Sequence, residues 1–86
     1  MKSKKLNGKA NIVGTNIQTY RLQQGLSLRQ LSDKLSLYGV NLYHSDIFDI
    51  ENHTRLVKDF ELKPICKILN ITYDQIFEDT DKDYLV

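Results

Sequence analysis

The chain has 86 residues, of which 41% are hydrophobic and 27% are charged, with four glycines and one proline. This composition is typical of one folded domain with a modest core, and it argues against a disordered or fibrous chain. Cys66 is the only cysteine, which excludes an intrachain disulfide and a zinc site built from several cysteines. The basic N-terminus lacks the apolar core of a signal peptide, and no apolar run is long enough to span a membrane, so we expect a cytoplasmic protein.

The net charge of +1 conceals an uneven distribution. Residues 1–45 carry seven bases and one acid, a net charge of +6, whereas residues 46–86 carry five bases and ten acids, a net charge of −5. A molecule polarised in this way can face nucleic acid with its basic side and solvent with its acidic side. Chance segregation of surface charges explains the same counts equally well, so the asymmetry alone does not select a function.

Charge and hydropathy divide the chain into a basic N-terminal arm (1–10), a central domain (11–79) and an acidic C-terminal tail (80–86). The first helix of the domain is predicted over residues 11–24, where Val13, Ile17 and Tyr20 recur with helical spacing. Gly25 follows, and glycine readily adopts the left-handed conformation that commonly ends a helix.

The second helix is predicted to begin at Leu28, because Ser27 and Gln30 have the spacing of a capping box. It runs to Leu35 and is followed by a turn over residues 36–41 that contains glycine and asparagine.

The third helix is predicted over residues 42–52, LYHSDIFDIEN, and ends near Asn52 and His53. One face is apolar and carries Leu42, Ile47 and Ile50. The opposite face carries Tyr43, His44, Ser45, Asp46 and Asp49. Two carboxylates on that face are unexpected if the helix contacts a polyanion.

A fourth helix is predicted after a polar connector at residues 53–58, with Asp59 as its N-cap. Its apolar stripe consists of Leu62, Ile65, Cys66 and Leu69. Pro64 leaves two possibilities: the helix begins near Leu62, or it begins earlier and gives up one backbone hydrogen bond.

A short fifth helix is predicted after a second capping box formed by Thr72 and Gln75, and it buries Ile76 and Phe77. The C-terminal tail is expected to fray. Its last apolar residues could instead dock on a neighbouring chain; they are Tyr84, Leu85 and Val86.

Taken in order, these segments resemble the Xre/Cro/C1 family of phage lambda repressor-like helix-turn-helix proteins, in particular a subgroup with a lengthened turn before the recognition helix. The resemblance covers about Val13 to Phe77. The matching segments are Gly14-x-x-Ile17-x-x-x-Arg21, Gly25-Leu26-Ser27, Gln30-Leu31-Ser32-x-Lys34-Leu35, Ile47-x-x-Ile50-Glu51-Asn52 and Leu69-x-Ile71-x-x-x-x-Ile76-Phe77.

The resemblance implies an all-α fold of five helices, with a helix-turn-helix at the second and third helices. It implies a non-enzymatic, sequence-specific transcriptional regulator without a cofactor, such as a small repressor of phage or mobile-element type. The partner would be double-stranded DNA, bound by a homodimer because one short helix contacts only a few base pairs. The expected dimer surface is the fifth helix with the tail through Leu85, and a regulatory protein partner is also compatible with this assignment.

The resemblance also assigns roles to individual residues. Base contacts fall on the first half of the third helix, which would lie in the major groove, at Tyr43, His44, Ser45 and Asp49. Phosphate contacts fall on Asn16, Arg29, Gln30, Asn52, Arg55 and Lys58. A structural ion pair between the first and third helices maps onto Arg21 and Glu51. The lysines of the N-terminal arm could contact the duplex or remain solvated; they are Lys2, Lys4, Lys5 and Lys9.

The two aspartates of the third helix allow different interpretations. Either carboxylate can accept a hydrogen bond from the amino group of cytosine, and it would repel phosphates at unsuitable sites. Asp46 lies in the first helical turn, where a carboxylate interacts favourably with the helix dipole, and we favour this role for it. The role of Asp49 stays open.

Two positions depart from the family pattern. Leu28 stands where many members begin the second helix with glutamine. His53 stands where a glycine usually ends the third helix, so His53 must adopt a left-handed conformation or the helix must end differently.

Three other functions are compatible with parts of the sequence. The third helix could bind a protein, as in an antirepressor or antitoxin-like partner, and exposure of Phe48 would favour this interpretation. Asp49 and His53, with His44 and Asp46 close by, could bind a metal ion, although histidines at a solvated helix end are usually unliganded. Cys66 could act as a nucleophile, but its place on an apolar stripe favours a small core residue.

Overall fold

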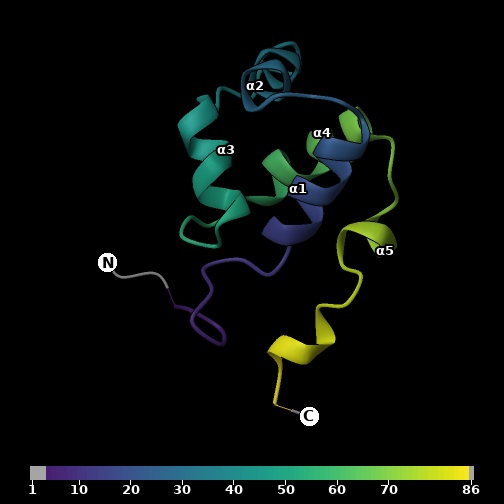
Figure 1. The fold of residues 1–86 in the computed structure, drawn as a ribbon. Coiled ribbons are helices and arrows are strands. Elements are labelled where there is room, and N and C mark those ends of the chain that lie inside the picture. The colour runs from purple at the N-terminus through teal and green to yellow at the C-terminus, as the bar shows by residue number, and fades with distance from the viewer. Residues whose placement is uncertain (1–3, 86) are drawn as a thin grey trace.

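A computed structural model describes residues 4–85 of the chain. It contains five α-helices, α1 (Gly14–Gln23), α2 (Leu28–Ser36), α3 (His44–Glu51), α4 (Asp59–Leu69) and α5 (Tyr73–Ile76), and a 3-10 helix, η1 (Asp81–Asp83) (Figure 1). No strand forms between residues 4 and 85, where Leu6 and Lys9 make an isolated β-bridge. The prediction of an all-α fold is therefore confirmed.

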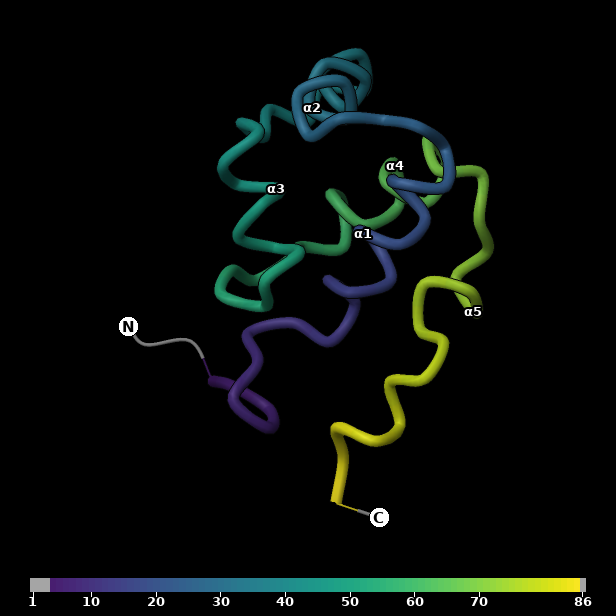
Figure 2. Tube along the Cα trace, viewed as in Figure 1, coloured from purple at the N-terminus to yellow at the C-terminus, as the bar shows by residue number. Residues whose placement is uncertain are grey.

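The helices enclose a core of aliphatic side chains. Figure 2 shows α2 across one end of the pair formed by α1 and α4, with α3 on one side and α5 on the other. The fully buried aliphatic side chains are Ile17, Leu31, Leu35, Ile47, Ile50, Ile65, Leu69 and Ile76. They come from all five α-helices, so each helix contributes its apolar face to a single core.

Two helices begin later than the sequence predicts. Helix α1 begins at Gly14 rather than at residue 11, because the Asn11 side-chain oxygen accepts the backbone N–H groups of Val13 (3.0 Å) and Gly14 (2.8 Å). Helix α3 begins at His44, so Leu42 precedes the helix and is buried in the core, while Tyr43 is the N-cap. Both offsets leave the apolar faces where the periodicity places them.

Helix α4 resolves the two possibilities left open by Pro64. It begins at Asp59, so Pro64 lies inside it and the Phe60 carbonyl has no N–H partner one turn later. The expected N-cap at Asp59 is wrong by one residue: Lys58 precedes the helix, and its backbone N–H donates to the Glu61 carboxylate at 2.9 Å. The capping boxes predicted at the starts of α2 and α5 are both present.

The expectation that the C-terminal tail frays is wrong for residues 80–83, which include the 3-10 helix η1. The Asp83 carboxylate is buried and accepts hydrogen bonds from Lys9 Nζ (2.8 Å) and Asn7 Nδ2 (3.2 Å). Asn7 and Gly8 have φ angles of 53° and 76°, as in the tight turn that an Asn-Gly pair favours between paired residues. The arm and the tail therefore pack against each other. Lys2 and Val86 lie outside the described residues.

No helix in the described part of the chain combines the length and the apolar character needed to cross a membrane.

Candidate nucleic-acid interface

The outward face of α3 is formed by side chains that make few contacts with the rest of the protein. The four predicted base-contacting residues, Tyr43, His44, Ser45 and Asp49, are all exposed. None of their side chains makes a hydrogen bond to another residue between positions 4 and 85. Their polar groups are consequently available to a partner.

The inward face of α3 is fixed by an ion pair with α1. Arg21 Nε donates to Glu51 Oε2 at 2.6 Å, and Arg21 Nη2 donates to Glu51 Oε1 at 3.0 Å. The two side chains are only 9% and 2% exposed. Arg21 Nη1 also donates to the Leu26 carbonyl, which connects the pair to the residues before α2. The ion pair implied by the resemblance is thus present, and it sets the position of α3 on α1.

The C-terminal end of α3 lies directly against the start of α1. A Cβ atom at Gly14 would lie 2.2 Å from the Ile50 carbonyl oxygen, which is closer than real Cβ atoms come. The Asn11 side-chain amide donates to the carbonyls of Ile50 (2.9 Å) and Arg55 (2.8 Å) while its oxygen caps α1. Asn11 is buried and both the nitrogen and the oxygen of its side-chain amide make two hydrogen bonds, and no pattern in the sequence predicted this role.

His53 occupies the position that ends α3, and it adopts the left-handed conformation that the sequence required as one alternative, with φ 65°. The His53 and Thr54 N–H groups donate to the Ile50 and Asp49 carbonyls, which is the Schellman arrangement. A left-handed backbone conformation is unfavourable for a residue other than glycine, and two contacts of the His53 ring offset this cost. Nδ1 lies 2.9 Å from the Asn11 carbonyl oxygen, and Nε2 lies 2.9 Å from Thr15 Oγ1. In a neutral ring the carbonyl requires the proton on Nδ1, and Nε2 then accepts from the threonine hydroxyl.

The turn before α3 is fixed at both ends. The Ser32 hydroxyl of α2 donates to the Leu42 carbonyl, which anchors the chain just before α3. At the start of α3, Asp46 Oδ2 accepts the Tyr43 backbone N–H at 2.9 Å. This contact caps the start of α3 and agrees with the dipole role favoured for Asp46, and it leaves Asp49 as the exposed carboxylate in the middle of the outward face.

The predicted phosphate-binding residues fall into two groups. Arg29, Gln30, Asn52 and Lys58 are exposed. The Gln30 side-chain oxygen accepts from Ser27 in the α2 capping box, so its amide nitrogen remains available. Asn52 donates to the Phe48 carbonyl, and the Lys58 ammonium lies 5.6 Å from the centre of the Phe60 ring.

Two of the predicted phosphate-binding side chains, Asn16 and Arg55, already use their donor groups in hydrogen bonds within the fold. We therefore do not include them among the phosphate contacts. Both N–H groups of the Asn16 amide donate to the carbonyls of Ile76 and Glu78, each at 2.8 Å, so Asn16 connects α1 to the end of α5. Arg55 makes a two-pronged ion pair with the buried Glu61, at 3.1 and 3.3 Å. Glu61 was not predicted to have a role, although its position three residues after Lys58 is a capping signal.

The pKa values of this ion pair show how strongly the two groups interact. The hydrogen bond to Glu61 raises the pKa of Arg55. Burial by itself would raise the pKa of Glu61, but the hydrogen bonds from Arg55 and the Lys58 backbone outweigh it and lower that pKa. Arg55 is therefore a cation that is already neutralised by its partner.

The N-terminal arm contributes less free charge than its sequence suggests. Lys9 is paired with Asp83, whereas Lys4 and Lys5 are exposed. Hydrogen bonds from Lys9 and Asn7 lower the pKa of Asp83, so this carboxylate stays ionised at neutral pH.

Phe48 is the apolar exception on the outward face of α3. Its side chain is 54% exposed, and Tyr43 at the start of the helix is 75% exposed. An exposed phenylalanine beside a carboxylate suits a protein partner better than a polyanion. The exposure of Phe48 was the feature expected to favour a protein-binding role.

Neither metal binding nor cysteine chemistry receives support from the geometry. Among residues 4–85, no three His, Cys, Asp or Glu side chains gather closely enough to hold a metal ion. Cys66 is 3% exposed in the core, and burial raises the pKa of its thiol, which disfavours the nucleophilic thiolate.

Comparisons with known proteins add no further assignment: no protein-family model matches the chain, and neither a curated protein nor a solved structure matches it.

Proposed function

We propose that this protein is a small, non-enzymatic DNA-binding transcriptional regulator that contacts double-stranded DNA through α3. The observation that carries the proposal is the contrast between the two faces of α3. The inward face is held by the buried Arg21–Glu51 pair, whereas the outward face presents polar side chains without partners among the described residues. A rigid helix with unsatisfied polar groups is what recognition of base edges requires.

The outward side chains can make distinct contacts in a major groove. His44 can donate to guanine, Ser45 can donate or accept, and Tyr43 can contact a thymine methyl or a phosphate. Asp49 would accept from the amino group of cytosine and would repel the backbone at sites without a suitably placed cytosine. Asp49 thus acts mainly in specificity, at a cost in affinity for every sequence.

Phosphate contacts would come from residues on either side of α3. Arg29 and Gln30 lie in the first turn of α2, where backbone N–H groups also face outward, and Asn52 and Lys58 follow α3. These contacts would fix the orientation of the helix without selecting a sequence. A homodimer would double them and recognise two half-sites, as expected of a repressor of phage or mobile-element type acting in the cytoplasm.

A second candidate function is binding of a regulatory protein through the same helix, in the manner of an antirepressor or antitoxin. The 54% exposure of Phe48 favours it. The two candidates differ in how Phe48→Ser acts: it should leave DNA binding nearly unchanged, and it should weaken a protein complex whose centre is this ring.

The test is selection from a random pool of DNA duplexes at near-physiological salt, followed by a salt titration of the enriched sequence. We expect an inverted repeat, with an affinity that falls steeply as salt rises because several phosphates are contacted. Asp49→Ala should relax the base preference at one position of each half-site. Asp74→Ala changes the charge equally at an exposed position of α5 and should leave that preference unchanged. Absence of any enriched sequence would contradict the proposal and favour the protein partner.

A further inference from the structure

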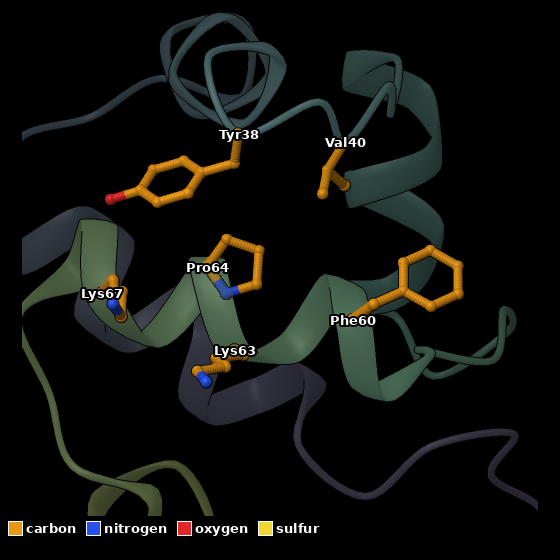
Figure 3. Close-up of a pocket in the computed structure, with 6 residues that line it drawn as sticks. All are labelled: Tyr38, Val40, Phe60, Lys63, Pro64 and Lys67. Carbon is orange, nitrogen blue, oxygen red and sulfur yellow. The ribbon is translucent and has the colours of Figure 1, made fainter.

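An apolar groove lies on the side of α4 that faces the turn after α2. Its lining consists of Tyr38, Val40, Phe60, Lys63, Pro64 and Lys67, and its volume is about 160 Å³. Figure 3 shows Val40 on the turn opposite Pro64, the Tyr38 ring directed toward the side of Lys67, and Phe60 at the other end of the groove. Tyr38 and Phe60 are 53% and 61% exposed, so two large rings border a hollow that nothing in the described chain fills.

The groove is bordered by positive charge. Lys63 and Lys67 are exposed on successive turns of α4, and Lys34 lies beside Tyr38 in an adjoining hollow. Asp59, next to Phe60, is the nearby acid. Apolar side chains between lysines suit a peptide segment that combines acidic residues with large apolar side chains.

The C-terminal tail of this chain has that complementary chemistry. Asp79 and Asp81 are exposed, and within residues 4–85 the one ion pair of the Asp79 carboxylate is with Lys82, at a distance of 3.9 Å. Tyr84 is 49% exposed, and Leu85 is as exposed as in an extended chain. The contact of Asp83 with Lys9 anchors the base of the tail, so Tyr84 and Leu85 are presented outward from a fixed point.

We propose that the groove on α4 receives the Tyr84–Leu85 end of the tail from a second copy of this chain. Figure 1 places the 3-10 helix η1, at the base of the tail, and α2 at opposite ends of a molecule that is 37 Å long. Two copies related by a two-fold axis and lying antiparallel would therefore make the same contact twice. The contact leaves the outward face of α3 free, since no residue of that helix lines the groove. This inference deepens the proposed function by naming the surface through which the dimer forms. It rests on the proposed function only in assigning the dimer a role in DNA binding.

Sedimentation equilibrium of the full chain without DNA tests this proposal independently of DNA binding. Wild-type protein should associate to a dimer, and Lys63→Glu with Lys67→Glu should weaken the association by about tenfold or more, because attraction becomes repulsion at both contacts. Asp79→Lys with Asp81→Lys should weaken it similarly. All four positions are exposed, and circular dichroism checks that the aspartate variant folds, because Asp79 has a left-handed φ of 63°, which aspartate adopts more readily than lysine.

Mixing the two charge-reversed variants provides the decisive measurement. In the mixed dimer, one contact is wild-type and the other has both charges reversed, so association should be restored. Lys4→Glu with Arg29→Glu changes the net charge as much as the groove variant does, and it should leave association unchanged. A wild-type chain that stays monomeric would overturn the proposal and leave the groove to an acidic segment of another protein. A dimer that is insensitive to the reversals, or a mixture that does not associate, would overturn it as well.

Discussion

Two junctions connect distant parts of this chain, and they differ in how far water is excluded from them. At the α1–α3 junction, Arg21 and Glu51 are 9% and 2% exposed, and Asn11 and Gly14 pack against the end of the same helix. At the terminal junction, Lys9 is 26% exposed while its partner Asp83 is 3% exposed. The same kind of ion pair therefore has different consequences. At the first junction, removal of either partner leaves a buried charge, whereas at the terminal junction removal of Asp83 leaves a lysine that water reaches.

The largest effect is expected from Gly14→Ala. The new methyl group would overlap the Ile50 carbonyl at 2.2 Å and would force α1 away from α3. We expect a loss of about 4 kcal/mol in the free energy of unfolding, measured by urea denaturation. Gln18→Gly and Gln18→Ala, at an exposed site of the same helix, supply the control, since there alanine should be the more stable by about 1 kcal/mol. A Gly14→Ala variant as stable as wild type would show that the close approach is absent.

Glu51→Ala should destabilise by about 3 kcal/mol, because the Arg21 guanidinium would remain buried without its carboxylate. The double replacement Arg21→Met with Glu51→Leu removes both charges and should recover much of this loss. If the double variant were no more stable than Glu51→Ala, the cost would come from lost packing rather than from an orphaned charge.

Asn11→Ala should cost about 2 kcal/mol, since it removes the α1 cap and the side-chain amide donors to the carbonyls of Ile50 and Arg55. Asn11→Asp separates these contributions, because a carboxylate still accepts the N–H groups of α1 but cannot donate to Ile50 and Arg55. Equal stability of the aspartate variant and wild type would assign the whole effect to the cap.

The smallest effect is expected at the terminal junction. The pKa of Asp83 is lowered in the folded chain, so its contribution is present above the ordinary aspartate pKa of about 3.9 and is lost as the pH falls through the lower folded value. Wild type should therefore exceed Asp83→Asn in stability at pH 7, and the difference in unfolding free energy should shrink below about pH 4. A difference that does not change with pH would mean that the Lys9 contact makes no electrostatic contribution.

Much of the fold and part of the candidate site follow from local patterns in the sequence. The helical spacing of Val13 and Ile17, the capping boxes and the apolar stripe of α4 predict the helices to within a few residues. Exposure of the predicted base-contacting residues also agrees with their position opposite Ile47 and Ile50. The errors in the predicted phosphate contacts concern two polar side chains. The residues next to Asn16 and Arg55 in the sequence do not indicate that the Ile76 carbonyl and the Glu61 carboxylate accept their hydrogen bonds.

The sequence by itself determined the all-α class, the order of the helices and which face of the first four helices is buried. At the fifth helix Ile76 is buried as predicted, but the predicted burial of Phe77 is wrong, since its side chain is 42% exposed. These properties depend on residues within a few positions of one another, where periodicity and capping act directly. The tertiary structure alone decided which polar groups remain free. The Asn16 amide donates to the end of α5, the Arg55 guanidinium pairs with Glu61, and the Lys9 ammonium pairs with Asp83. Arg29 and Lys58, in contrast, stay exposed. A polar side chain is available to a partner only if no residue brought close by folding satisfies it first.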